Sequence, residues 1–227
     1  MMKIFIQEFS LNHIKFPEFL DFFVSKNSEL SEKERSINNL RYDDFILSGN
    51  FFQKIILKEE TNNPYGEKSF IEYEYFINQE FYLVNHSSKY YLVITNPSKF
   101  SKNFYSYFDN IVGLKLILKD KKIDINHLLE FNLKDINYKL VKAKFSSVAL
   151  SKNSKATIEI ISSSNAIEDF KNNFGEVYYE INKIKILMHM KKYNNLDLEI
   201  SRSGLIQSTV LKSIHDNDIL ELLDLIF

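Results

Sequence analysis

The chain has 227 residues, of which 44% are hydrophobic and 26% charged, so it can bury the core of one large domain or of two small ones. It contains no cysteine, which excludes disulfides, thiolate nucleophiles and zinc–thiolate sites. Only 3 arginines accompany 26 lysines, so bidentate clamps for carboxylates or phosphates are limited to Arg35, Arg41 and Arg202.

Targeting and membrane-spanning signals are not evident in the sequence. The N-terminal residues lack the apolar core and small-residue cleavage site of a signal peptide, and no apolar run approaches the length of a transmembrane helix. We therefore expect a soluble, cytoplasmic protein without a membrane partner. The abundance of Lys, Asn, Ile and Phe is typical of a low-GC microbial genome.

The first part of the chain predicts short strands around one helix. Residues 3–9 alternate as a strand does, and Pro17 is placed to begin a helix. Residues 27–41 are polar and favour either a capped helix or an exposed loop. A meander of three strands is expected next, at 45–57 with a turn or bulge at Gly49, at 71–77 with one buried face, and at 81–84.

Residues 90–118 show the predicted organisation most clearly. The apolar run 90–95 is typical of a buried strand, Ser98 is a credible N-cap, and Gly113 is placed to end the helix that follows. Alternation from Leu114 to Leu118 predicts another strand, so the stretch is a strand–helix–strand unit. The expected helix carries one apolar face, made of Phe100, Phe104, Tyr107, Phe108 and Ile111.

The second part repeats this plan in outline. Asp124 can cap a short helix, and residues 138–161 predict a long hairpin that turns at 151–154. Ser164 or Asn165 can cap a second helix, which Gly175 would end. Further strands are expected at 178–190 and at 196–200.

These elements predict an α+β fold with mainly antiparallel sheet and with helices packed on one face. No stretch has the composition of a linker, since only 5 Gly and 3 Pro are spread along the chain. We expect a single compact unit with two lobes, a β-rich lobe over 1–113 and an α+β lobe over 114–227.

The C-terminal helix is the most apolar element that we expect. Its stripe follows the i, i+3, i+4, i+7 spacing and must be covered. The helix can dock on its own sheet, or part of it can meet a partner or a second copy of the chain. The interface candidates are Ile219, Leu222, Leu223, Ile226 and Phe227.

Motifs for catalysis are missing from the sequence. There is no G-x-G-x-x-G, no P-loop and no G-x-S-x-G, and the five histidines have no metal-ligand spacing. Glu72 and Glu74 share a strand face, but a solvated strand face explains them better than proton transfer does. The sequence therefore predicts no catalytic residue, no metal site and no cofactor.

Charge is distributed unevenly along the chain. Residues 1–113 carry 12 basic and 15 acidic side chains, residues 114–192 carry 15 and 9, and residues 193–227 carry 2 and 6. A basic block of net +6 thus precedes an acidic tail of net −4. Strand alternation gathers the basic residues on common faces, which makes nucleic-acid-binding candidates of Lys142, Lys144, Lys183, Lys185, His189 and Lys191.

Three functions fit these patterns. The leading hypothesis is a non-enzymatic binding or assembly protein, with a protein partner or a second copy of the chain as its target. The second is nucleic-acid binding by the lysine-rich face, although this face could instead pair with the acidic tail in the same molecule or another. The third is a hydrolase or nuclease whose acidic residues converge only in the fold.

Overall fold

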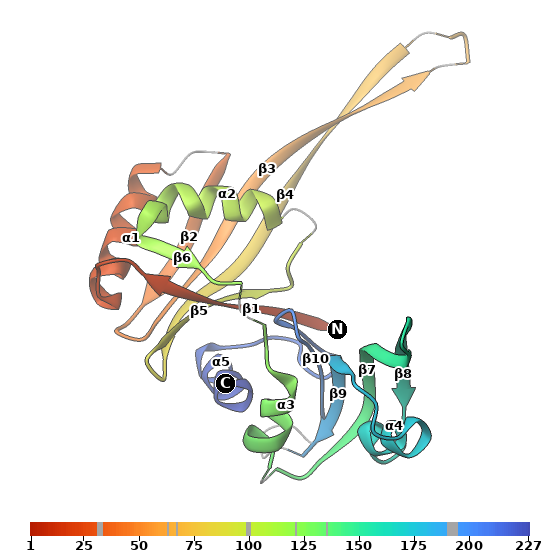
Figure 1. The fold of residues 1–227 in the computed structure, drawn as a ribbon. Coiled ribbons are helices and arrows are strands. Elements are labelled where there is room, and N and C mark those ends of the chain that lie inside the picture. The colour runs from red at the N-terminus through yellow and green to blue at the C-terminus, as the bar shows by residue number, and fades with distance from the viewer. Residues whose placement is uncertain are drawn as a thin grey trace. The chain divides into compact units, whose positions relative to one another are not determined.

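A computed structural model gives the fold shown in Figure 1. It describes residues 1–30, 34–62, 64–66, 68–98, 101–120, 122–134, 136–189 and 195–227. The chain forms two compact units, which we call the N-terminal unit, Phe9–Leu118, and the C-terminal unit, Met1–Glu8 with Lys119–Phe227. The division thus lies at 118/119 rather than near 113, and the first eight residues belong to the C-terminal unit. Phe100, Met190 and Lys191 lie outside the described residues.

The N-terminal unit is an antiparallel sheet with helices on one face. Its main strands are ordered β2-β3-β4-β5. The end of strand β1 (Met2–Leu11) also belongs to this unit and pairs with β6. The other elements are α1 (Phe16–Leu30), β2 (Arg35–Tyr42), β3 (Ile46–Asn62), β4 (Lys68–His86), β5 (Lys89–Thr95), α2 (Ser101–Val112), the short turn η1 (Gly113–Lys115) and β6 (Leu116–Leu118).

Aromatic side chains form the core of this unit. Phe81 of β4 is fully buried, and its ring lies 5.2 Å from that of Phe104 and 6.2 Å from that of Phe23. Phe51 of β3 packs in the same way against Phe104 and Tyr107, at 5.7 and 5.6 Å. Because Phe104 and Tyr107 belong to the predicted apolar stripe of α2, that stripe is confirmed as the core face of the helix.

The C-terminal unit is also an antiparallel sheet with helices. The first residues of β1 pair with β11, and the order continues β11-β10-β9-β7-β8. The elements are α3 (Ile125–His127), the turn η2 (Leu128–Asn132), β7 (Tyr138–Ser151), β8 (Ser154–Ile161), α4 (Ala166–Phe174), β9 (Glu180–Met188), β10 (Leu196–Ser201), β11 (Leu205–Ser208) and α5 (Asp216–Ile226).

Local capping chemistry sets several helix ends in this unit as the sequence predicts. Asp124 accepts hydrogen bonds from the backbone N–H groups of Asn126 and His127, both at 3.1 Å. Asn165, rather than Ser164, caps α4 by accepting from Ile167 N at 3.0 Å. These caps use only neighbours in the sequence, which is why the pattern predicts them.

The N-cap of α5 lies just before the acidic residues of its first turn. His215 occupies the N-cap position, and its backbone N–H donates to the Asp218 carboxylate at 3.0 Å. Asp218 therefore sits three residues after the cap and closes the first turn from inside the helix.

Other expectations for the N-terminal unit need correction. The polar stretch 27–41 is neither a single helix nor a loop, because α1 extends to Leu30 and strand β2 begins at Arg35. Gly49 does not interrupt a strand, since β3 runs straight through it. A Cβ at Gly49 would lie 2.8 Å from Leu40 Cδ2, so the glycine makes room for a neighbouring side chain. Strands expected at 71–77 and 81–84 are parts of one strand, β4.

The two expected strand–helix–strand units exist in chain order but not as neighbouring strands. β6 follows α2 and pairs with β1, while β9 follows α4 and pairs with β7 and β10. The hairpin expected over 138–161 is confirmed as β7 and β8. Across the described part of the chain, no helix is long and apolar enough to cross a membrane.

Candidate functional site

Strands β3 and β4 continue past the rest of the N-terminal unit as a two-stranded ribbon (Figure 1). Their pairing is regular along the whole length, with Ile55 opposite Tyr75 and Leu57 opposite Tyr73. Neighbouring strand β2 reaches β3 only as far as Gln53, and β5 is in register with β4 only from Phe81 onward. We call residues 54–62 and 68–76 the ribbon.

One side of the ribbon, which we call the apolar face, continues the side that α2 covers in the body of the unit. Opposite residues of an antiparallel pair point to the same side, and the side alternates at every residue. Phe51 and Phe81 therefore point to the same side as Leu57, and they pack on α2. The large side chains of the apolar face are Ile55, Leu57, Ile71, Tyr73 and Tyr75.

Water reaches much of the apolar face. The exposed fractions are 51% for Leu57, 46% for Ile71 and 42% for Tyr73. Glu59 is the single charged residue of the described ribbon on this side, and it accepts a hydrogen bond from the Tyr73 hydroxyl. This bond is the main reason that the pKa of Tyr73 is raised. An exposed apolar strip with one charged residue, Glu59, among its described residues is typical of an interaction surface.

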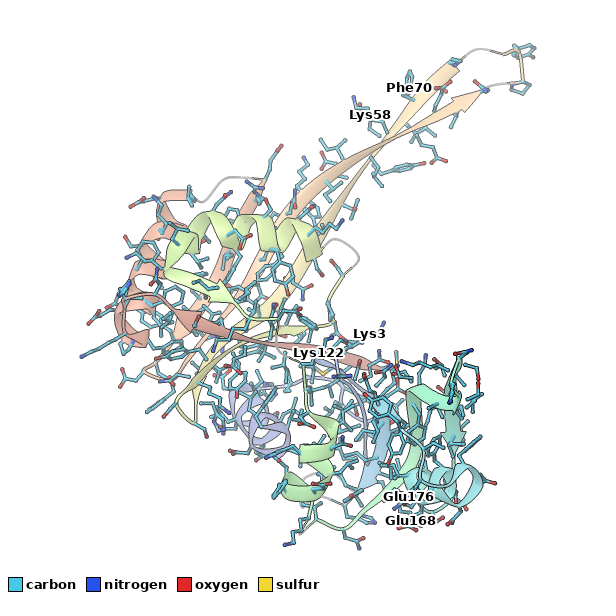
Figure 2. All side chains as sticks on the ribbon, in the orientation of Figure 1. Lys3, Lys58, Phe70, Lys122, Glu168 and Glu176 are labelled. Atoms are coloured by element: carbon cyan, nitrogen blue, oxygen red, sulfur yellow. The ribbon has the colours of Figure 1, made fainter. Side chains whose placement is uncertain are left out.

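The opposite side of the ribbon, the charged face, carries three cross-strand ion pairs. They join Lys54 to Glu74 at 2.5 Å, Lys58 to Glu72 at 2.6 Å and Lys68 to Glu60 at 2.6 Å. Exposed Ile56, Phe70 and Phe76 lie between these pairs. Figure 2 shows Lys58 and Phe70 on this exposed ribbon, one from each strand.

The ribbon could not be recognised from the sequence. Alternation at Ile71, Tyr73 and Tyr75 predicts one buried face. A strand whose apolar face is exposed has the same alternation as a strand whose apolar face is buried, so the sequence does not distinguish them. The acidic side chains Glu72 and Glu74 do lie on one strand face, but each is paired with a lysine of β3.

The lysine-rich face predicted from the sequence does come together in the C-terminal unit. β7 and β9 are neighbours, with Lys142 opposite Lys185 and Lys144 opposite Lys183. His189 is exposed just after the end of β9. Lys191 lies outside the described residues.

Carboxylates of the same sheet neutralise most of these amines. Lys142 pairs with Glu159 of β8 at 3.0 Å. Lys183 pairs with Glu199 and Lys185 with Asp197, at 2.8 and 3.3 Å, and both carboxylates belong to β10. The acidic tail thus meets the basic block within one molecule, which is one of the arrangements that the sequence left open.

The interface candidates of the C-terminal helix are inside the C-terminal unit. Ile219, Leu222, Leu223 and Ile226 of α5 are buried, and Phe227 is half-buried. Leu222 and Leu225 line a small cavity together with Leu196 and Leu198 of β10, so the helix packs on its own sheet. In this arrangement the apolar stripe is not accessible to a partner.

Among the residues that the structure describes, no three or more His, Asp or Glu side chains are grouped as metal ligands. No protein-family model matches the chain, and no curated protein matches it either.

Proposed function

We propose that this chain is a non-enzymatic binding or assembly protein that contacts a protein partner through the apolar face of the β3–β4 ribbon. The exposure of Leu57, Ile71 and Tyr73, on a face whose one charged residue in the described ribbon is Glu59, is the observation that carries the proposal. Burial of apolar surface contributes roughly 25 cal/mol of free energy for each Å² removed from water, so a complex in which a partner covers this strip is stabilised.

The body of the N-terminal unit indicates what kind of surface fits. There the same side of β3 and β4 is covered by α2, whose Phe104 and Tyr107 pack on Phe51. We therefore expect the partner to present a helix or a sheet face with large apolar side chains, as an interface core does.

The charge of the ribbon favours a protein over a polyanion. The ribbon contains 3 Lys and 4 Glu, a net charge of −1. Nucleic acids and anionic lipid surfaces are attracted to basic elements, and an acidic ribbon opposes them. A protein surface with apolar side chains at its centre has no such conflict.

A photo-crosslinking amino acid placed at Leu57 or at Lys58, one at a time, tests the proposal in cells that make the protein. The two positions are neighbours on one strand but point to opposite faces. We expect a discrete protein crosslink from position 57 and much less from position 58. Mass spectrometry of the crosslinked band identifies the partner or a second copy.

The matched loss-of-function variant is Leu57→Asp with Tyr73→Ser, and Lys58→Ser serves as the control on the charged face. With the photo-crosslinking amino acid placed at position 71 as a reporter, the first variant should no longer give the crosslinked complex. The control should still give it. Equal crosslinking from both faces, or none from position 57, contradicts the proposal.

Nucleic-acid binding is the second candidate, and the alignment of Lys142 with Lys185 and of Lys144 with Lys183 favours it. Fluorescence anisotropy with labelled single-stranded and duplex DNA, across a salt titration, measures it. Binding that falls steeply with salt and is lost in Lys144→Glu with Lys183→Glu supports this function. Because three of the four amines already have carboxylate partners, we expect little binding at physiological salt.

A further inference from the structure

A polar cleft of about 450 Å³ lies within the C-terminal unit, and none of the functions above uses it. Its size is in the range of small-molecule sites, roughly 300–1,000 Å³. Its walls come from the segment before α3, the start of β9 and the turn after β10. The polar side chains that line it are Lys122, Asp124, Asn126, Tyr178, Glu180 and Arg202.

Arg202 is held firmly at this cleft. Its backbone N–H donates to Asn182 O at 2.8 Å, and its carbonyl accepts from Ile123 N at 2.9 Å. Its guanidinium Nη1 donates to Glu180 Oε2 at 2.5 Å. Anchoring of both backbone and side chain fixes the direction of the guanidinium before any ligand arrives, which reduces the entropy lost on binding.

Both carboxylate oxygens of Glu180 accept a hydrogen bond from a neighbouring side chain. Arg202 bonds one carboxylate oxygen, and the Tyr178 hydroxyl donates to the other at 3.2 Å. The hydrogen bonds from Arg202 and from Tyr178, with the charges of Arg202 and Lys122, hold the pKa of Glu180 below its usual range. Glu180 therefore stays ionised near neutral pH and serves to orient Arg202.

Donors and acceptors in the cleft are unequal. Each carboxylate already accepts hydrogen bonds from the protein, Asp124 through Oδ1 from the backbone of α3 and Glu180 from Arg202 and Tyr178. A guanidinium has five N–H donors, and the contact with Glu180 uses Nη1. Lys122, an exposed residue labelled in Figure 2, adds a second cation. The group that complements this arrangement is an oxyanion.

We propose that this cleft binds a small molecule through an oxyanion, a carboxylate or a phosphate, held by Arg202 and Lys122. The planar guanidinium suits either group because it donates in parallel to two oxygens. Tyr178, with 63% of its surface exposed, provides a ring face for the flat part of a ligand. The site is separate from the ribbon, so the inference does not depend on the assembly function.

The test is a titration of the whole ¹⁵N-labelled chain with inorganic phosphate and, in a second arm, with succinate, at constant ionic strength set by chloride. We expect saturable shifts of the amide signals of Lys122, Glu180 and Arg202 in at least one arm. The arm with the lower Kd tells whether the natural ligand carries phosphate or carboxylate.

Three variants complete the test. Lys122→Gln should weaken binding by about tenfold, the size of one charge-assisted hydrogen bond, and Lys134→Gln, an exposed lysine of the same unit that does not line the cleft, should leave the Kd unchanged. Arg202→Gln should abolish saturation. Shifts that do not saturate, or an unchanged Kd in Lys122→Gln, would overturn the proposal, and neither result bears on the ribbon.

Discussion

The Lys119 ammonium lies 2.7 Å from Glu8 Oε1, and the Lys119 backbone N–H donates to the Glu8 carbonyl at 2.9 Å. Glu8 ends the first segment of the C-terminal unit, and Lys119 begins the second. Only 7% of the Glu8 side chain is exposed, so its charge has little access to water. The ion pair and the backbone bond together fasten the first strand to the rest of its unit.

Replacement of Lys119 by alanine should therefore destabilise the C-terminal unit. We expect a loss of about 1–2 kcal/mol in the free energy of unfolding, less than for a fully buried pair because the lysine is partly exposed. Hydrogen exchange of the β10 and β11 amides under rising denaturant measures it. Lys134→Ala removes an exposed lysine of the same unit and should change little, whereas equal effects of both variants would contradict the role of the pair.

Asp197 makes the stability of the same unit depend on pH. Burial opposes its ionisation, but hydrogen bonds from Thr209 and Ser208, with Lys185, outweigh burial and lower its pKa from 3.8 to about 2. Thr209 donates from both its backbone N–H and its hydroxyl, each at 2.8 Å. The ionised carboxylate thereby fixes the chain where it leaves β11.

A group with a lowered folded-state pKa stabilises the fold above its unfolded pKa, and this contribution is lost as the pH falls through the folded pKa. The advantage of the wild type over Asp197→Asn should therefore shrink by about 2 kcal/mol between about pH 5 and about pH 2. Denaturant unfolding of both proteins at several pH values measures this difference. A gap that stays constant over that interval would show that the carboxylate charge is not responsible.

Position 204 requires glycine because of its backbone conformation and because of the atoms that surround it. Its φ is +90°, and a Cβ there would lie 2.3 Å from the Ile6 carbonyl oxygen, which belongs to β1. Gly204→Ala should cost about 2–4 kcal/mol, because backbone strain adds to a clash with main chain that cannot move easily. Gly175→Ala is the matched control, since Gly175 also has positive φ, +71°, but open space around it. Gly175→Ala should cost about 1–3 kcal/mol from backbone strain alone, less than Gly204→Ala, and similar losses at both sites in thermal unfolding would exclude the clash.

Much of the fold follows from local patterns in the sequence. The stripe of α2, the caps at Asp124 and Asn165, and the hairpin of β7 and β8 depend on residues close together in the chain. Strand β2 was missed because its sequence is polar and its pairing with β3 is what makes it a strand. The local sequence pattern indicates which element a segment can form, and pairing with strands distant in the chain determines which element it does form.

The candidate sites were harder to predict for the same reason. Alternation placed Lys183 and Lys185 on one face, but which carboxylates neutralise them depends on β10 lying beside β9. The apolar face of the ribbon has the pattern of a buried strand, and only the absence of a covering helix over Leu57 and Tyr73 distinguishes it. Arg202 and Glu180 meet across 22 residues of sequence, without a motif that links them.

Two phenylalanines of β4 differ in burial, because Phe81 belongs to the core of the N-terminal unit and Phe76 to its ribbon. Phe81 is fully buried among Phe23, Phe104 and Phe108, while Phe76 is 56% exposed and stacks on Phe52, at 5.2 Å. Phe81→Ala should cost about 3–5 kcal/mol, because it leaves a cavity in packed aromatic rings. Phe76→Ala should cost less than about 1 kcal/mol, because a surface pair loses little apolar burial.

Hydrogen exchange of the β4 and β5 amides under rising denaturant reports both values for the same unit. The comparison also shows whether the ribbon is needed for folding. A small effect of Phe76→Ala, beside a large effect of Phe81→Ala, means that this exposed aromatic pair on the charged face of the ribbon does not stabilise the unit. A large effect at Phe76 would instead show that the ribbon belongs to the folding core.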